Sequence, residues 1–271
     1  MNIPRVFSMC FSPTGTTKKT VKTISDSLAK LYNTRCESIN FTLPEAREKE
    51  YTFSKGDIVV FGVPVYAGRV PNVLLKFLTS KVSGNGAFAV PVVLFGNRNY
   101  DDALIELCGI LEKDGFIIAS AGAFVGEHSF SYSLGKGRPN EDDLNKAITL
   151  SEMTYKRIGE NCVPSPLKVK GETPIRPYYT PRDRHGNPIN ILKVKPKTAF
   201  SCTSCGKCAN LCPMGSISKA DPKVITGICI KCCACVKGCP VHAKYFDDKG
   251  YVYHKTELED IYSRPAESEI F

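Results

Sequence analysis

The sequence predicts an α/β protein in which a doubly wound parallel sheet is joined to a small cysteine-rich module. Two observations carry this prediction. Short apolar runs alternate with amphipathic stretches through the first 162 residues, and such alternation is typical of a parallel sheet covered on both faces. Eight of the thirteen cysteines then form two runs of identical spacing near the C-terminus. The parts expected are a sheet domain, a proline-rich basic linker, a cysteine module and a polar tail, at residues 1–162, 163–200, 201–246 and 247–271.

The first part supplies strands and helices in alternation. Short apolar runs predict strands at residues 5–11, 58–63, 88–95 and 117–125. Amphipathic stretches predict helices at residues 17–32, 71–78, 101–113 and 141–159. In the polar tail, residues 256–262 are expected to form one short helix.

The net charge of +9 is concentrated in one segment. Residues 163–201 hold eight Lys or Arg against two Asp or Glu, together with seven prolines. Either these cations keep an extended strand solvated, or they form a docking surface for an acidic redox partner. No recognisable nucleic-acid-binding module accompanies them, so no nucleic-acid partner is expected.

The chain contains no apolar run long enough to span a membrane, and no leader is evident after Met1. Clustered cysteines in odd number do not suggest a disulfide framework. We therefore expect a cytoplasmic protein with free thiols. The oligomeric state is left open by the sequence.

The cysteine module repeats one spacing twice. The first run is Cys202-x-x-Cys205-x-x-Cys208-x-x-x-Cys212-Pro, and the second repeats it 27 residues later from Cys229 to Cys239. This is the bacterial pattern for two [4Fe–4S] clusters, in which the fourth cysteine of each run ligates the other cluster. The expected ligands are Cys202, Cys205, Cys208 and Cys239 for the first cluster, and Cys229, Cys232, Cys235 and Cys212 for the second. Zinc is the alternative metal.

Five cysteines lie outside this pattern. Cys233 is an additional thiol inside the second run, and it is expected either to fill space beside the cluster or to act as an alternative ligand. Core packing is expected for the other four, which are Cys10, Cys36, Cys108 and Cys162.

A loop rich in hydroxyl groups follows the first predicted strand and leads into a helix. It reads Ser12-Pro13-Thr14-Gly15-Thr16-Thr17. Exposed N–H groups at a helix N-terminus favour an anion, and glycine lets the backbone approach it closely. The Gly-Lys-Ser/Thr of a nucleoside-triphosphate loop is absent, and so is a Gly-x-Gly-x-x-Gly motif.

The hydroxyl-rich loop resembles the phosphate loop of flavodoxins, which bind FMN. The resemblance implies that two later loops hold the flavin ring, with Tyr66 or Tyr100 stacking on it. The implied contacts in these loops are Pro64, Val65, Tyr66, Ala67 and Gly68, then Gly96, Asn97, Arg98, Tyr100 and Asp101. His128, after the last predicted strand, is expected at the same edge of the sheet, where Arg69 and Arg98 would add positive charge.

The whole chain resembles the proteins of anaerobes that fuse a flavodoxin-like domain to a two-cluster ferredoxin, a small α+β domain. The resemblance implies an electron-transfer protein that passes electrons between low-potential [4Fe–4S] clusters and FMN, with a redox protein as partner. The alternative is a ferredoxin-linked flavin reductase with a small substrate at the FMN face, so catalytic residues stay unassigned. The linker is expected to lie on the surface and to let the cysteine module dock at the carboxyl edge of the sheet.

Overall fold

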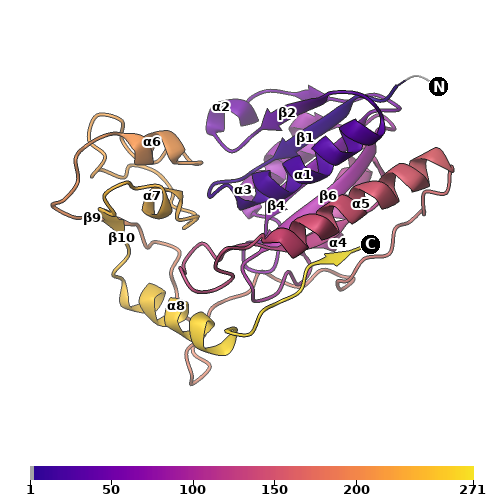
Figure 1. Ribbon diagram of the computed structural model, residues 1–271. Helices are drawn as coiled ribbons and strands as arrows, with labels where there is room; N and C mark the ends of the chain where they lie inside the picture. The colour runs from indigo at the N-terminus through magenta and orange to yellow at the C-terminus, as the bar shows by residue number, and fades with distance from the viewer. Residues whose placement is uncertain (1–2) are drawn as a thin grey trace.

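A computed structural model describes residues 3–271 (Figure 1). Its central sheet has the order β11-β8-β6-β4-β1-β2, with β7 pairing β6, and all pairings are parallel except that of β11. Taken along the five main parallel strands, this is the order 2-1-3-4-5 of the flavodoxin-like doubly wound sheet. The strands of this sheet are β1 (Val6–Cys10), β2 (Cys36–Asn40), β4 (Ile58–Pro64), β6 (Phe88–Phe95), β7 (Ile117–Ile118), β8 (Gly122–Val125) and β11 (Glu269–Ile270).

Helices cover both faces of the sheet, as the alternating pattern predicts. Helices α1 and α5 pack together on one face, and α3 and α4 lie on the other (Figure 1). The five helices of this sheet domain are α1 (Thr16–Leu31), α2 (Pro44–Arg47), α3 (Asn72–Lys81), α4 (Ala103–Lys113) and α5 (Glu141–Gly159). A small two-stranded pair, β3 (Tyr51–Thr52) with β5 (Val82–Ser83), lies beside them.

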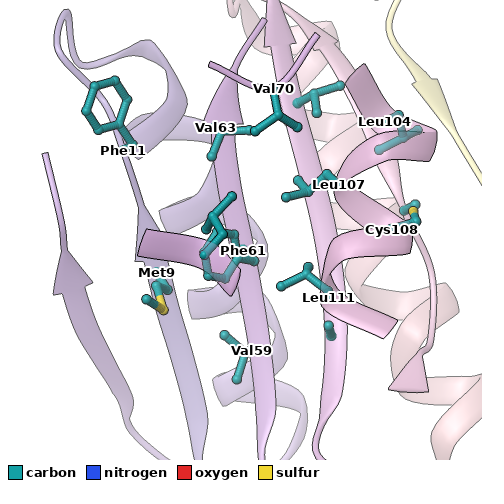
Figure 2. Close-up of a cluster of buried hydrophobic side chains, with 14 of the residues drawn as sticks. Met9, Phe11, Val59, Phe61, Val63, Val70, Leu104, Leu107, Cys108 and Leu111 are labelled. Carbon is teal, nitrogen blue, oxygen red and sulfur yellow. The ribbon is translucent and has the colours of Figure 1, made fainter. Parts of the chain in front are cut away.

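The larger of the two cores lies between the sheet and the α3–α4 face. Figure 2 shows Met9, Phe61 and Val63 from the strands in the same buried cluster as Leu104 and Leu107 from α4. All five side chains are fully buried. Burying an aliphatic or aromatic side chain of this size stabilises a fold by about 1.5–3 kcal/mol. This core holds the strands in register, so the loops after β1, β4, β6 and β8 meet at one edge, here called the carboxyl edge.

Two sequence expectations in this domain need correction. The single strand expected at 117–125 is divided into β7 and β8, because the chain shifts along β6 between the two pairings. Cys162 is exposed and Cys36 is half-buried, so only Cys10 and Cys108 of the four isolated cysteines lie in the core. All thirteen cysteines are free thiols.

The cysteine module contains little regular structure. It consists of α6 (Lys207–Leu211), α7 (Ala234–Lys237) and the antiparallel pair β9 (Lys197–Thr198) with β10 (Lys244–Tyr245). Figure 1 places it beside the carboxyl edge of the sheet domain, with α6 and α7 stacked one above the other. Among the helices of residues 3–271, none has both the length and the apolar character needed to cross a bilayer.

The tail is part of the fold. The sequence predicts a polar tail with one short helix at 256–262, whereas α8 spans Lys249–Ile261 and β11 then joins the sheet beside β8. Asp248 begins the helix by accepting a hydrogen bond from the N–H of Tyr251 (3.0 Å). Ser268 accepts from the N–H of Val125 (3.0 Å) and donates to Asp143 (2.6 Å). These contacts fix the tail to the sheet domain.

The linker lies along the carboxyl edge and is held there by Asp102. This carboxylate is fully buried, and it accepts hydrogen bonds from the N–H groups of Glu172 (3.0 Å) and Arg176 (2.8 Å). The Arg176 guanidinium also pairs with it and holds the pKa of Asp102 well below its usual range. Further along, the Tyr178 hydroxyl donates to the carbonyl of Val70 (2.9 Å). The linker is therefore fixed to the sheet domain by defined contacts, and it is here called the strap.

We expect Asp102→Asn to loosen this strap. The substitution keeps the side-chain shape but removes the charge that two backbone N–H groups and a guanidinium require, so the free energy of unfolding should fall by about 2–3 kcal/mol. Chemical denaturation and limited proteolysis of residues 163–200 measure the effect. Asp26→Asn is the control, because Asp26 makes only an exposed ion pair with Lys22 and should cost about 0.5 kcal/mol or less. Equal losses in both variants would contradict the assigned role.

Candidate functional site

The hydroxyl-rich loop presents backbone N–H donors at the start of α1. Gly15 precedes the helix with a φ of 94°, a value that favours glycine. The Ser12 hydroxyl accepts from the N–H of Lys18 (2.9 Å), and the N–H of Ser12 donates to Thr42 (2.8 Å). Within residues 3–271, the N–H groups of residues 14–17 have no protein acceptor. They lie at a helix N-terminus, where the macrodipole favours an anion.

The helix that begins at this loop approaches the sheet very closely. A side chain at Gly62, on β4, would place its Cβ 2.2 Å from a methyl group of Val21 and 3.0 Å from one of Thr17. Glycine is required there for α1 to pack on the strand. Thr17 is consequently buried, while Thr14 stays exposed at the tip of the loop and Thr16 is half-buried.

The loop after β4 makes a tight turn that brings Tyr66 to the cysteine module. Tyr66 and Arg69 exchange two backbone hydrogen bonds (3.0 and 3.1 Å), and Ala67 and Gly68 between them both have positive φ. Burial raises the pKa of the half-buried Tyr66 well above its ordinary value, and the nearby thiols of the second cysteine run, above all Cys232, raise it further. Tyr66 therefore lies between the carboxyl edge and the second run.

The loop after β6 is occupied by contacts within the protein. Asn97 donates to the carbonyls of Tyr262 (2.6 Å) and Arg264 (2.9 Å) and accepts from the N–H of Ala266 (3.0 Å). Arg98 pairs with Asp101 and lies over the ring of Tyr179, 4.6 Å from its centroid. This loop therefore holds the tail and the linker in place.

Tyr100 and Arg69, both expected near a flavin, have partners elsewhere. The Tyr100 ring is 5% exposed and packs against Phe95, and its hydroxyl donates to Glu269 of β11 (2.9 Å). Arg69 pairs with both carboxylate oxygens of Glu106 (2.7 and 2.6 Å). Tyr66 is therefore the better placed of the two tyrosines for stacking.

His128 lies at the carboxyl edge, against Gly96. A Cβ at Gly96 would approach the imidazole to 2.4 Å, so glycine is required for this packing. Burial, together with the adjacent positive charge of Lys237, lowers the pKa of His128 to about 4. Its Nδ1 accepts from the N–H of Phe130 (3.1 Å), which requires that nitrogen to be unprotonated. His128 is therefore neutral at pH 7 and brings no positive charge to the site.

The two cysteine runs surround two hollows, and each hollow is lined by cysteines from both runs. The outer hollow, about 310 Å³ including space open to solvent, is lined by Cys202, Cys205 and Cys208 of the first run and Cys239 of the second. The inner hollow, about 390 Å³ on the same measure, is lined by Cys229, Cys232, Cys233 and Cys235 of the second run and Cys212 of the first. The grouping, apart from the added Cys233, is the crossed one that the spacing predicts.

The repeat extends to the backbone around these hollows. Residues 27 positions apart share positive φ, at Ser204 and Lys231, at Gly206 and Cys233, and at Gly215 and His242. The fourth cysteine of each run accepts a hydrogen bond from the N–H four residues later, Cys212 from Ser216 (3.4 Å) and Cys239 from Ala243 (3.2 Å). Such N–H donors are suited to thiolate sulfur. Within residues 3–271, no three Cys, His, Asp or Glu side chains converge on a single metal ion.

Lys237 anchors the cysteine module to the sheet domain. Its ammonium group donates to Glu127 (2.5 Å) and to the carbonyls of His128 (2.7 Å) and Ser131 (2.9 Å), all in the loop after β8. The side chain is 15% exposed. At a second point, Arg47 of α2 donates to the carbonyl of Pro213 (2.5 Å), next to Cys212. The module therefore contacts the sheet domain through residues that adjoin both runs.

An aromatic seam joins α8 to the same loop. Phe130 packs against Tyr251 (4.7 Å between ring centroids), and Tyr251 stacks on Phe246 (4.3 Å). The Tyr251 hydroxyl lies 3.3 Å from the sulfur of Cys233.

The sequence contains no motif that identifies three of these contact residues, Lys237, Arg47 and Phe130. Lys237 occupies a position that the cysteine spacing leaves unspecified. Arg47 lies in a short helix and Phe130 in a loop, and neither belongs to a recognisable pattern.

Comparisons with known proteins return distant likenesses of fold. No protein-family model and no curated protein matches the chain. A flavodoxin from the domain Archaea is 15% identical with a TM-score of 0.42, covering 57% of this chain and 99% of its own. A flavodoxin of Streptococcus pneumonia TIGR4 is 18% identical with a TM-score of 0.40, covering 56% and 98%. The Flv1 flavodiiron core from Synechocystis sp. PCC6803 is 15% identical with a TM-score of 0.41, covering 59% of this chain and 37% of its own. The strand order itself identifies the fold.

Proposed function

We propose that this protein is an electron-transfer iron–sulfur flavoprotein that binds FMN at the carboxyl edge and two [4Fe–4S] clusters in the cysteine module. The observation that carries the proposal is the position of Tyr66. This residue belongs to a loop that follows a central strand, where doubly wound sheets bind ligands, and its pKa is raised by burial and then by the thiols of Cys232, Cys233 and Cys229. A flavin site and a cluster site thus share one boundary within one chain.

The donor sets fit these groups. Eight thiols grouped by four around two hollows, with N–H donors to the fourth sulfur of each run, suit two four-iron clusters with crossed ligation. The unpaired N–H groups of residues 14–17 suit a phosphate ester, as in FMN. When bound, such clusters exchange single electrons and FMN exchanges two, with protons from water.

The chain's own residues hold these sites together. The loop at Thr14 and Gly15 binds the phosphate, and the turn at Tyr66 supplies an aromatic residue for the flavin ring. Lys237 fixes the distance between that hollow and the carboxyl edge through three hydrogen bonds. His128, neutral and packed on Gly96, excludes water from the edge without adding charge.

FMN binding is expected to depend on the exposed hydroxyl of Thr14. Thr14→Val removes a hydrogen bond to a charged phosphate, worth about 1.5–3 kcal/mol, so FMN should bind about tenfold more weakly or worse. Titrating flavin-free protein while following FMN fluorescence measures this. Thr149→Val, on the exposed face of α5, should bind as the wild type does. Extraction of FAD, or unchanged affinity in Thr14→Val, would count against the FMN site.

Iron and sulfide analysis tests the clusters and their crossing. Anaerobically purified protein should contain about eight iron and eight sulfide per chain. Cys212→Ala should remove the same paramagnetic signal as Cys229→Ala and leave the signal that Cys202→Ala removes. Cys162→Ala, an exposed thiol, is the control and should change nothing. Loss of one signal in both Cys212→Ala and Cys202→Ala would refute crossed ligation, and zinc without iron would refute the clusters.

Transfer within the chain is expected to depend on Lys237. After rapid reduction of the clusters, flavin reduction should proceed at a rate independent of protein concentration. Lys237→Met should slow it by about tenfold or more, because small displacements of reacting groups carry large rate costs. Lys237→Arg should restore part of the rate, and Lys249→Met, an exposed lysine at the start of α8, should leave it unchanged.

Two results would contradict this assignment. A Lys237→Met rate equal to that of the wild type would show that the anchor does not position the module. A wild-type rate that falls in proportion on dilution would show that electrons pass between molecules.

A further inference from the structure

The internal repeat gives the cysteine module two equivalent faces, one for each run, and these faces differ in burial. Four positions of the first run are exposed, namely Thr203, Ser204, Cys205 and Lys207. Their equivalents 27 residues later are half-buried or buried, namely Ile230, Lys231, Cys232 and Ala234. The two runs therefore share their backbone conformation but differ in how much of each is exposed to solvent.

The buried face is the one turned to the sheet domain. Ile230 packs against the large core of that domain. Lys237, the anchor, occupies the position equivalent to the exposed Asn210. At these positions the second run therefore contacts the sheet domain and the first run is exposed, while Arg47 contacts the first run further along, at Pro213.

The exposed face has the composition of a docking surface. Phe200 is fully exposed, and Val241, which lines the outer hollow, is 39% exposed. Phe200 lies in the turn 199–202, which contains Cys202 of the outer hollow and whose first residue donates its N–H to the carbonyl of Ala243, two residues after Val241. Lys207 lines that hollow, is exposed and, within residues 3–271, pairs with no carboxylate. An apolar centre with a charged rim is the usual anatomy of an interface.

The occupant is indicated by charge. Residues 203–223 contain three exposed lysines, Lys207, Lys219 and Lys223, and one exposed carboxylate, Asp221, so this segment carries a net positive charge. The basic linker, the other candidate surface, has most of its cations engaged. Ion pairs within the chain occupy four of them, Lys170, Arg176, Arg184 and Lys197, and Lys195 donates to the carbonyl of Ile225. The free positive charge beside a cysteine site therefore lies on the outer face.

We propose that the outer face, formed by Phe200, Lys207 and Val241 around the outer hollow, docks an acidic one-electron carrier protein. This inference rests on the proposed function, and it names the partner class and the site at which electrons cross. In each docking event the carrier would lose one electron, and the four-iron cluster held by the outer cysteine site would gain it. Two such events would supply the two electrons that FMN would take up by way of the cluster at the inner cysteine site.

Binding of a purified acidic two-cluster bacterial ferredoxin to the cofactor-loaded protein tests the proposal. Isothermal titration at low ionic strength should give a dissociation constant that weakens steeply with added salt. Lys207→Glu and Phe200→Ala should each weaken binding by about tenfold or more. Lys113→Glu, an exposed lysine at the far end of α4, should bind as the wild type does. Iron, flavin and the internal rate of flavin reduction should be unchanged in Phe200→Ala and Lys113→Glu, and the affinity of Lys207→Glu is compared at equal iron content.

Two results would overturn the docking site. One is wild-type affinity in both Lys207→Glu and Phe200→Ala. The other is a loss of affinity in the linker variant Lys193→Glu that exceeds the loss in Lys207→Glu. Because internal flavin reduction and metal content are measured separately, either result leaves the proposed function standing. Absence of iron from the wild type would instead remove the proposed function itself.

Discussion

The ion-paired ammonium group of Lys237 is the contact on which the arrangement of the two halves depends. A lysine has three donors, and here Glu127 and the carbonyls of His128 and Ser131 accept all three. Because the group is largely removed from solvent, any shift of the module would leave a charge without partners in a poorly solvated place. Because leaving this ammonium group without partners costs free energy, the cysteine module is held in one position against the sheet domain. Burial lowers the pKa of His128, and the positive charge of Lys237 adds to this effect, so His128 is neutral beside it.

The chain reinforces this contact by tying the module at both ends. On the N-terminal side, Asp102 holds the linker against the sheet domain by its buried carboxylate. On the C-terminal side, α8 leads back to β11, which adds an antiparallel strand to the sheet. The cysteine module is thus inserted between two segments, the linker and the tail, that are both attached to the sheet domain. Two carriers joined by a single flexible tether would have no such constraint.

The sequence predicts the fold well where burial produces a periodic signal, and poorly elsewhere. The central strands β1, β4 and β6 and the helices α1 and α5 are found within a residue or two of their expected bounds, because each buries a continuous apolar run or stripe. Strand β2 lies at the sheet edge and is mostly exposed, so it has no apolar run. Strand β11 has two residues, and its pairing with β8 is a tertiary contact that no local pattern specifies.

The candidate site shows the same division. Covalent spacing determines which cysteines approach one another, so the grouping of Cys212 with the second run was predictable. The conformation of the loop after β6 was not predictable, since Asn97 and Tyr100 form hydrogen bonds with tail residues that lie 167 and 169 positions later in the chain. The contacts of Lys237 and Arg47 were not predictable from the sequence for the same reason. A hydrogen bond between distant segments leaves no trace in the composition of either.

One substitution in the repeat explains how a symmetric module acquires an inner and an outer face. Gly206 and Cys233 occupy equivalent left-handed positions before α6 and α7, with φ of 72° and 58°. That conformation costs a residue other than glycine roughly 1–2 kcal/mol, so the cysteine must be stabilised by its contacts. It is 3% exposed and lies beside the Tyr251 hydroxyl in the aromatic seam. Burial raises the pKa of Cys233 to about 11, so the thiol is neutral and favours a packing role. Glycine at the outer position offers no such surface, and that face stays open to solvent.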